Sequence, residues 1–307
     1  MAITAIILTV SNDFNRLRPL YSLLKENLPV DRVVFIGNQE VERLLTECSL
    51  GQGYEFLNEE SLIPFESVRA VIENIFDGKQ VTRGFVGWYY QQFLKLAYAA
   101  NCEDQYYLAW DGDTVPIRQI SFFKDGKPYM GMKNEYHKPY FDTLNRIFLE
   151  MHKAIKSSFI AEHMLFERQT VNEMLHEIMC AQHLNGATFF ERIFRTMEPE
   201  ILNGNSFSEF ETYGTYVAYR HPEKYILRRW NSFRHCGQYF RPDDITDAEI
   251  KWLAKDFQAL TFEKGQEPSP EAAFFRNPEY QEKLSAKYIL QVIQENSTSG
   301  YVEEWDD

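Results

Sequence analysis

The sequence has few cysteines, and no two of them stand at the spacing of a metal site. Only four occur among 307 residues, at Cys48, Cys102, Cys180 and Cys236. No Cys-x-x-Cys is present, so the sequence indicates neither a zinc knuckle nor a disulfide framework. This scarcity favours a reducing, cytoplasmic setting, because disulfides persist mainly in oxidising compartments.

Long apolar runs are missing as well. No stretch approaches the roughly 20 apolar residues that a membrane-spanning helix needs. The N-terminus leads straight into a short apolar segment with no basic residues before it, unlike a secretory signal. We therefore expect a cytoplasmic protein, with any membrane contact peripheral and at the inner face.

Positive charge is in short supply. The chain has 32 Lys and Arg against 45 Asp and Glu, a net charge of −13. An acidic surface argues against nonspecific binding of nucleic acid or of anionic membranes. A local basic pocket for an anionic ligand is still compatible with this balance, and the candidates for it are the pair Arg228-Arg229, Arg234 and Lys95.

Several common nucleotide and metal motifs are absent. No G-x-G-x-x-G follows the first expected strand, and no G-x-x-x-x-G-K-[ST] occurs, so neither the dinucleotide fingerprint nor the P-loop is present. Neither H-x-x-x-H nor H-E-x-x-H occurs, which leaves zinc-dependent hydrolysis without support.

The chain does carry a strong α/β pattern. Residues 3–10 form a nearly continuous apolar run, typical of a strand buried on both faces. Apolar residues at helical spacing follow over residues 17–24, and a second strand is expected over residues 32–38. This β-α-β order predicts a mostly parallel sheet with a right-handed crossover and flanking helices. The glycines of residues 84–87 predict a loop, followed by a helix to Ala100.

The length permits one large domain or two small ones. An apolar content of 44% is enough for a substantial core, and aromatic residues are abundant at 15%. Residues 266–270, Gln-Glu-Pro-Ser-Pro, resemble a linker. We therefore divide the chain into a domain of residues 1–265 and a helical C-terminal extension of residues 266–307 that ends in an acidic tail.

Residues 106–113 combine an expected strand with a pair of carboxylates. The apolar residues 106–110 read as a buried strand that ends in Asp111-Gly112-Asp113. At the carboxyl end of a strand in an open α/β sheet, two such carboxylates can face the ligand-binding crevice. Their oxygens suit Mg²⁺ or Mn²⁺, which also take phosphate oxygens of a substrate. Gly112 allows a tight turn between them. The alternative is an ordinary Asp-Gly turn without a metal.

A second acidic cluster lies at Glu209 and Glu211, on either side of an aromatic residue and just before an expected helix. The structural interpretation is helix capping, with Ser206 and Glu209 or Ser208 and Glu211 as alternative pairs. The functional interpretation is a general base, which needs a carboxylate near the reacting hydroxyl. Both hold if one glutamate belongs to the cap and the other faces a cleft.

Taken together, these features resemble the GT-A-fold glycosyltransferases, and more closely a bacterial family of uncharacterised glycosyltransferases. The resemblance rests on a buried first strand, a strand ending in Asp-x-Asp, a later acidic helix start and a C-terminal histidine. The matching stretches are residues 87–95, 110–114, 158–166 and 207–214. Their order along most of the first 265 residues makes the set more specific than any one of them. Gly112 stands where the family often has alanine.

The resemblance implies a role for each candidate. Asp111 and Asp113 would hold a divalent Mn or Mg ion against the donor's diphosphate, with His235 as third ligand and His221 in reserve. The remaining assignments are these: Thr9, Val10 and Ser11 at the donor's base and ribose, Lys95 near its phosphates or against the metal-site acids, Trp88 and His163 at the acceptor, and Glu209 or Glu211 as the base. Histidines outside such a family argument are more often structural.

The implied activity is transfer of a sugar from a nucleotide-sugar to a carbohydrate or lipid-linked glycan acceptor, in bacterial surface polysaccharide synthesis. A base among the two glutamates would invert the anomeric configuration, which we favour, whereas its absence would leave a retaining route. A sugar nucleotidyltransferase or a phosphoryl-transfer enzyme is an alternative, although Ser11-Asn12-Asp13 is not the Gly-rich loop that a nucleotidyltransferase carries after its first strand. A non-catalytic sugar-binding or nucleotide-binding protein is another.

Overall fold

The computed structural model describes residues 2–48, 50, 53–76, 81–197 and 205–295. Its centre is a five-stranded sheet with the strand order β3-β2-β1-β4-β8. These strands are β1 (Ile3–Leu8), β2 (Arg32–Gly37), β3 (Tyr54–Asn58), β4 (Tyr106–Asp111) and β8 (His163–Glu167). The first four are parallel to one another, and only β8 runs antiparallel, beside β4.

The described residues also form two small three-stranded sheets. One has the order β10-β11-β5, and the other β6-β7-β9. Their strands are β5 (Thr114–Pro116), β6 (Phe123–Lys124), β7 (Lys127–Met132), β9 (Ile226–Arg229), β10 (Ser232–Phe233) and β11 (Ala259–Thr261).

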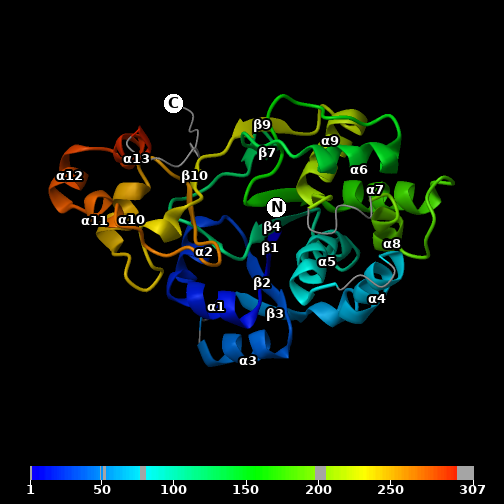
Figure 1. Cartoon of the computed structure of the whole chain (residues 1–307), viewed down its shortest axis with the longest axis horizontal. Coiled ribbons are helices and arrows are strands. Elements are labelled where there is room, and N and C mark those ends of the chain that lie inside the picture. Colours follow the sequence, from blue (N-terminus) through cyan, green and yellow to red (C-terminus); the bar gives the residue numbers. More distant parts are fainter. Residues whose placement is uncertain (1, 49, 51–52, 77–80, 198–204, 296–307) are drawn as a thin grey trace.

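Helices cover both faces of the central sheet (Figure 1). In chain order they are α1 (Ser11–Leu17), α2 (Ser22–Asn27), α3 (Gln39–Cys48), α4 (Phe65–Ile75), α5 (Arg83–Ala97), α6 (Lys138–Phe148), α7 (Arg168–Cys180), α8 (Phe189–Phe194), α9 (Glu209–Arg220), α10 (Asp247–Leu253), α11 (Ala272–Phe275), α12 (Pro278–Lys283) and α13 (Ala286–Glu295). No helix in the described part of the chain is both long and apolar enough to cross a membrane.

The alternation of side chains along β1 produces two cores. Ile6 and Leu8 point into one apolar cluster with residues of α4, α5, α7, α8 and α9. Ala5 and Ile7 point into the other, with residues of α1, α2, α3 and α10. Every residue of β1 is buried, which is why the strand reads as a continuous apolar run. The expected mixed, mostly parallel sheet between helices is therefore confirmed.

The C-terminal helices share the second core. Ala272 and Phe275 of α11 and Ile289 and Leu290 of α13 are buried in it, beside Trp252 of α10. The helices α11 and α13 thus pack on the rest of the chain, while the acidic tail lies outside the described residues.

One local expectation was wrong. Gly84 and Gly87 lie inside α5, not in a loop, because Thr82 caps the helix by accepting a hydrogen bond from the amide of Phe85. The strand β7 is the middle strand of its sheet, between β6 and β9. Its second partner, β9, lies almost a hundred residues later, where no local pattern points to it.

Candidate functional site

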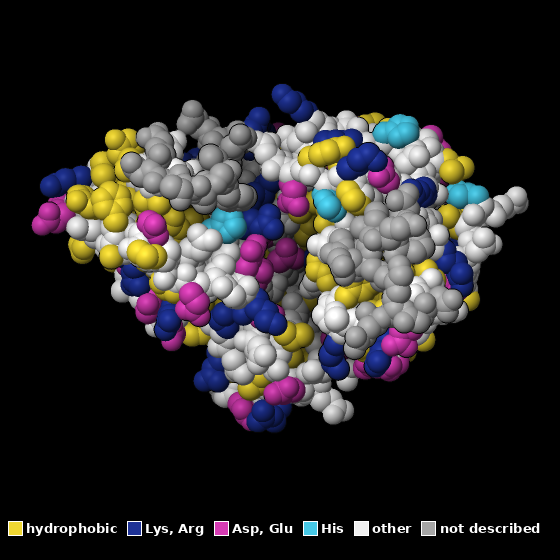
Figure 2. Space-filling view, in the orientation of Figure 1, with side chains coloured by type: hydrophobic (Ala, Val, Ile, Leu, Met, Phe, Trp, Pro, Cys, Tyr) yellow, Lys and Arg dark blue, Asp and Glu magenta, His cyan; other side chains and the backbone are white. Residues whose placement is uncertain are grey.

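A cavity of about 380 Å³ opens at the carboxyl edge of the central sheet. Leu8 and Asp111, the last residues of the adjacent parallel strands β1 and β4, are paired in register and both line it. The strands β2 and β3 lie on one side of β1 in the sheet, and β4, which follows them in the chain, lies on the other side of β1. The cavity therefore lies at the topological switch point, where open α/β sheets bind ligands. The space-filling view shows this face hollowed near its centre, among acidic and basic side chains (Figure 2).

Gly112 allows the two strand ends to come together. A Cβ atom at this position would lie 2.3 Å from the carbonyl oxygen of Leu8, closer than any side chain tolerates. The backbone of Gly112 is not in the left-handed region, so the requirement is for close approach and not for an unusual turn. An alanine at this position would force the ends of β1 and β4 apart.

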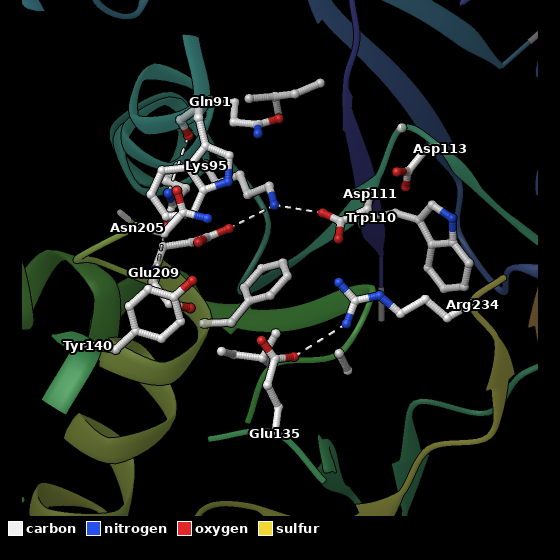
Figure 3. Close-up of a pocket in the computed structure, with 18 of the residues that line it drawn as sticks. Gln91, Lys95, Trp110, Asp111, Asp113, Glu135, Tyr140, Asn205, Glu209 and Arg234 are labelled. Carbon is white, nitrogen blue, oxygen red and sulfur yellow. Dashed lines mark hydrogen bonds and ion pairs between the residues drawn. The ribbon is translucent and has the colours of Figure 1, made fainter. Parts of the chain in front are cut away.

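Lys95 lies at the centre of the charged groups in the cavity (Figure 3). Its Nζ is 2.7 Å from Oδ1 of Asp111 and 2.7 Å from Oε1 of Glu209, and 4.2 Å from the centre of the Phe210 ring. Burial by itself would lower the pKa of this lysine, but the two carboxylates outweigh burial and raise it, so the ammonium stays charged. One buried cation thus connects α5, β4 and α9.

Asp113 sits in a crowded negative environment. Its Oδ1 accepts a hydrogen bond from the Thr114 hydroxyl at 3.3 Å. Burial, followed by the charges of Asp111, Glu263 and Glu162, raises the pKa of Asp113 to about 7. A carboxylate in such surroundings is stabilised by a nearby cation.

The composition of the lining favours a cation. It contains five carboxylates, those of Asp13, Asp111, Asp113, Glu135 and Glu209, against two cations, Lys95 and Arg234, a formal excess of three negative charges. Oδ2 of Asp111 and Oδ2 of Asp113 have no hydrogen-bond donor among the described residues. These two oxygens fit a divalent ion of the Mg²⁺ type, which is commonly held by one or two carboxylates together with water and substrate phosphates.

A third protein ligand is not assembled in this structure. No group of three or more His, Cys, Asp or Glu side chains in the described part of the chain has the arrangement of a metal site. His235 does lie at the same end of a small sheet as Asp113, because Phe262 bridges to His235 and donates its amide to the carbonyl of Asp113 at 2.8 Å. The imidazole of His235 is not part of the cavity lining.

The start of α9 separates the two glutamates. Ser208 caps the helix by accepting a hydrogen bond from the amide of Glu211 at 3.2 Å. Glu209 lines the cavity, and its amide donates to Oε1 of Gln92 on α5 at 3.1 Å. Glu211 is buried on another side of the helix, where its Oε2 accepts hydrogen bonds from Ser158 Oγ at 2.6 Å and from the amide of Phe159 at 3.0 Å. Glu209 is therefore the glutamate that can reach a ligand.

The sequence profile of one protein family, the family of unknown function DUF6492, matches residues 6–277. The chain belongs to this family. No curated protein matches it significantly.

Among solved structures, this DUF6492 chain has distant likenesses, each at 12% sequence identity. Mouse xyloside xylosyltransferase 1 gives a TM-score of 0.43 over 88% of this chain and 99% of that one. The bifunctional glycosyltransferase WbbM gives a TM-score of 0.45 over 95% of this chain and 49% of the WbbM chain. An active-site mutant of LgtC gives a TM-score of 0.42 over 97% of this chain and 98% of the LgtC chain.

The remaining predicted residues of this DUF6492 member are distributed unevenly. Trp88 lines the cavity, but Thr9, Val10 and Ser11 do not, although Leu8 and Asp13 on either side of them do. His163, the first residue of β8, is buried beside β4, where it stacks on Trp110 at 5.4 Å and lies against Trp230 at 4.2 Å between ring centres. Burial lowers the pKa of His163 to about 3, so its imidazole is neutral. His221 pairs with Glu173 at 3.0 Å on another part of the protein.

The stretch around His163 has a structural role that its sequence did not reveal. Glu162 is buried, and its Oε1 accepts hydrogen bonds from Lys133 Nζ at 2.9 Å and Ser232 Oγ at 2.7 Å. Its Oε2 accepts one from Trp230 Nε1 at 2.7 Å. Burial acts to raise the pKa of Glu162, but the charge and hydrogen bonds of Lys133, with the Ser232 hydroxyl, lower it to about 2. This network fastens β8 to the segment that leads into β10.

Several cavity residues were not proposed as site residues from the sequence. These are Gln91, Gln92, Glu135, Tyr140, Asn205 and Arg234. Arg234 pairs with Glu263 at 2.8 Å and with Glu135 at 3.5 Å, and it was considered only as a general candidate for anion binding. Glu135 and Asn205 come from connections before helices, where no periodic pattern singles out one residue. Gln92 carries the clearest signal, since it lies one helical turn before Lys95.

Proposed function

We propose that this protein is a glycosyltransferase that moves a sugar from a nucleotide-sugar donor to a carbohydrate or lipid-linked glycan acceptor. The observation that carries the proposal is the acidic cavity at the switch point of the sheet, in which Lys95 joins Asp111 to Glu209 and Asp113 lies alongside. Bacterial surface polysaccharide synthesis is the setting that the sequence resemblance implies.

A divalent metal fits the proposal. Asp111 and Asp113 would hold it, with His235 as the further ligand that the resemblance implies. When bound, such an ion stabilises negative charge that develops on a leaving diphosphate. Lys95 and Arg234 are the chain's own cations in the cavity, and they would add to that stabilisation.

The chemical step then needs a proton acceptor near the acceptor hydroxyl. The hydroxyl oxygen forms a bond to the anomeric carbon, while the bond from that carbon to the diphosphate oxygen breaks and the nucleoside diphosphate leaves with the electron pair. We assign the hydroxyl proton to Glu209, because it lines the cavity and Glu211 does not. Burial, only partly offset by Lys95, raises the pKa of Glu209, which suits a base. Attack opposite the leaving group inverts the anomeric carbon.

The test is turnover. Nucleoside diphosphate release is measured from a panel of UDP-, GDP- and CMP-sugars (nucleoside monophosphate for CMP-sugars), with Mn²⁺, with Mg²⁺ and with EDTA. We expect at least one donor to be consumed only with the metal, and Asp113→Ala to abolish this activity while the melting temperature is kept. Full activity of Asp113→Ala, or activity that is equal in EDTA, would contradict the metal-dependent assignment.

A further inference from the structure

Lys95 is a buried cation in a cavity whose lining has more carboxylates than cations. Its side chain is 6% exposed, and each of its two ion-pair partners lies at 2.7 Å. Asp111 comes from β4 and Glu209 from α9, so the ammonium is held from two sides, above the Phe210 ring. Burial of an ammonium is costly unless it is well paired. Because both pairs are short and the ring adds a cation–π contact, Lys95 has little freedom to leave.

This placement has a consequence for any metal at the Asp-x-Asp turn. One oxygen of Asp111 already accepts from Lys95. A divalent ion on the other oxygen would lie close to the buried ammonium and would be repelled by it. A free divalent ion therefore gains less from this cavity than its number of carboxylates suggests.

An anionic donor changes this balance. A nucleoside diphosphate sugar carries two phosphates, and a phosphate oxygen between the ammonium and the metal would be attracted by both. We propose that Lys95 is a built-in counter-ion that competes with a free divalent cation for Asp111, so that the metal binds well only together with an anionic donor. The inference rests on the proposed function, because it takes the donor to be a nucleoside diphosphate ester. Lys95 is here a positioning residue, which acts through Asp111.

The first experiment is calorimetric titration of the full-length protein with Mn²⁺ alone. The variants are Lys95→Met, Glu209→Gln and the double variant with both changes. The double variant neutralises both members of the buried Lys95–Glu209 pair and keeps both aspartates, so it leaves no buried Glu209 carboxylate unpaired and serves as the second variant where the single lysine change prevents folding. Removal of a neighbouring positive charge should strengthen Mn²⁺ binding at least about tenfold in Lys95→Met and in the double variant. Glu209→Gln, which keeps Lys95 against Asp111, should bind no more tightly than wild type.

The second experiment repeats the titrations with UDP or GDP present, whichever stabilises the wild-type protein. The nucleotide should raise the Mn²⁺ affinity of the wild type by a larger factor than that of the double variant. Only in the wild type does the anionic nucleotide offset the repulsion between the Lys95 ammonium and the metal ion. The inference is overturned if the double variant binds Mn²⁺ no more tightly than wild type, or if the nucleotide strengthens Mn²⁺ binding equally in both.

Asp113→Ala separates this inference from the proposed function. Loss of Mn²⁺–nucleotide binding in Asp113→Ala, combined with equal Mn²⁺ affinity in the wild type and the double variant, would remove the role of Lys95 and leave the metal site standing. Unchanged Mn²⁺–nucleotide binding in Asp113→Ala would remove the metal site itself, and the role of Lys95 with it.

Discussion

Two buried glutamates of this protein each pair with a lysine, and they differ in what else they contact. Glu162 accepts hydrogen bonds from Lys133, Ser232 and Trp230, so both of its oxygens are satisfied. Glu209 pairs with Lys95, which it shares with Asp111, and it borders a cavity. The pKa of Glu162 is lowered to about 2, whereas burial raises that of Glu209.

The difference distinguishes a structural network from the proposed active site. A fully hydrogen-bonded buried carboxylate stabilises one arrangement of the chain and has no capacity left for a ligand. A carboxylate with a raised pKa beside a cavity can accept a proton, and such shifts are concentrated at functional sites. We therefore read the Glu162 network as the support of the cavity and the Lys95–Asp111–Glu209 group as its chemistry.

The largest expected effect is on turnover. Glu209→Gln should lower the rate of sugar transfer by about 10²–10⁴-fold, because it removes the proposed general base, while donor affinity is kept. The matched control is Glu211→Gln, which lies two residues away and does not line the cavity. It should lower the melting temperature and keep most of the turnover. If Glu211→Gln loses turnover and Glu209→Gln does not, the assignment of the base is wrong; if both changes affect only stability, neither glutamate is the base.

The supporting network should show the opposite pattern. Glu162→Gln leaves Lys133 without its counter-ion in a largely buried position. We expect a loss of about 3 kcal/mol in the free energy of unfolding, typical of breaking one partner of a buried ion pair. Urea denaturation measures this loss, and the turnover per folded molecule should stay within a few-fold of wild type. A large loss of turnover without loss of stability would place Glu162 in the chemistry instead.

The smallest effect concerns the pH dependence of stability. The pKa of His163 is lowered to about 3 in the folded protein. Its neutral form therefore stabilises the fold at pH values above the histidine pKa of the unfolded chain, which is about 6.5. That stabilisation is lost as the pH falls from about 6.5 toward 3, and it amounts to about 2 kcal/mol between pH 7.5 and pH 5. His163→Gln should flatten this part of the unfolding profile, whatever its effect at pH 7.5. An equally steep profile in the variant would mean that His163 is protonated in the folded state.

The sequence predicts the local features of this protein well. The continuous apolar run of β1 and the strand that ends at Asp111 both follow from short-range patterns, and the structure contains both of them. The helix α5 was missed at its start because two glycines have low helix propensity, whereas the Thr82 cap and the packing of the following turns override it.

The grouping of the site was harder to predict, since it depends on contacts between distant residues. Lys95 and Glu209 are 114 positions apart, and their distance is set by how α5 and α9 pack on the same face of the sheet. The choice between Glu209 and Glu211 depends on the rotation of one helix about its axis, which the Ser208 cap and the Glu211–Ser158 hydrogen bond fix. The roles of Glu162 and His163 were hidden for the same reason, because their partners lie up to seventy residues away.

One measurement tests the central claim most directly: a thermal-shift screen of the wild type and Asp113→Ala against UDP, GDP, CMP and their sugars, each with and without Mn²⁺. A ligand that binds only the folded state raises the melting temperature. We predict a clear rise for one nucleotide class that requires Mn²⁺ and disappears in Asp113→Ala. No rise with any pair, or an equal rise in the variant, would contradict the account of this cavity as a metal-dependent nucleotide-sugar site.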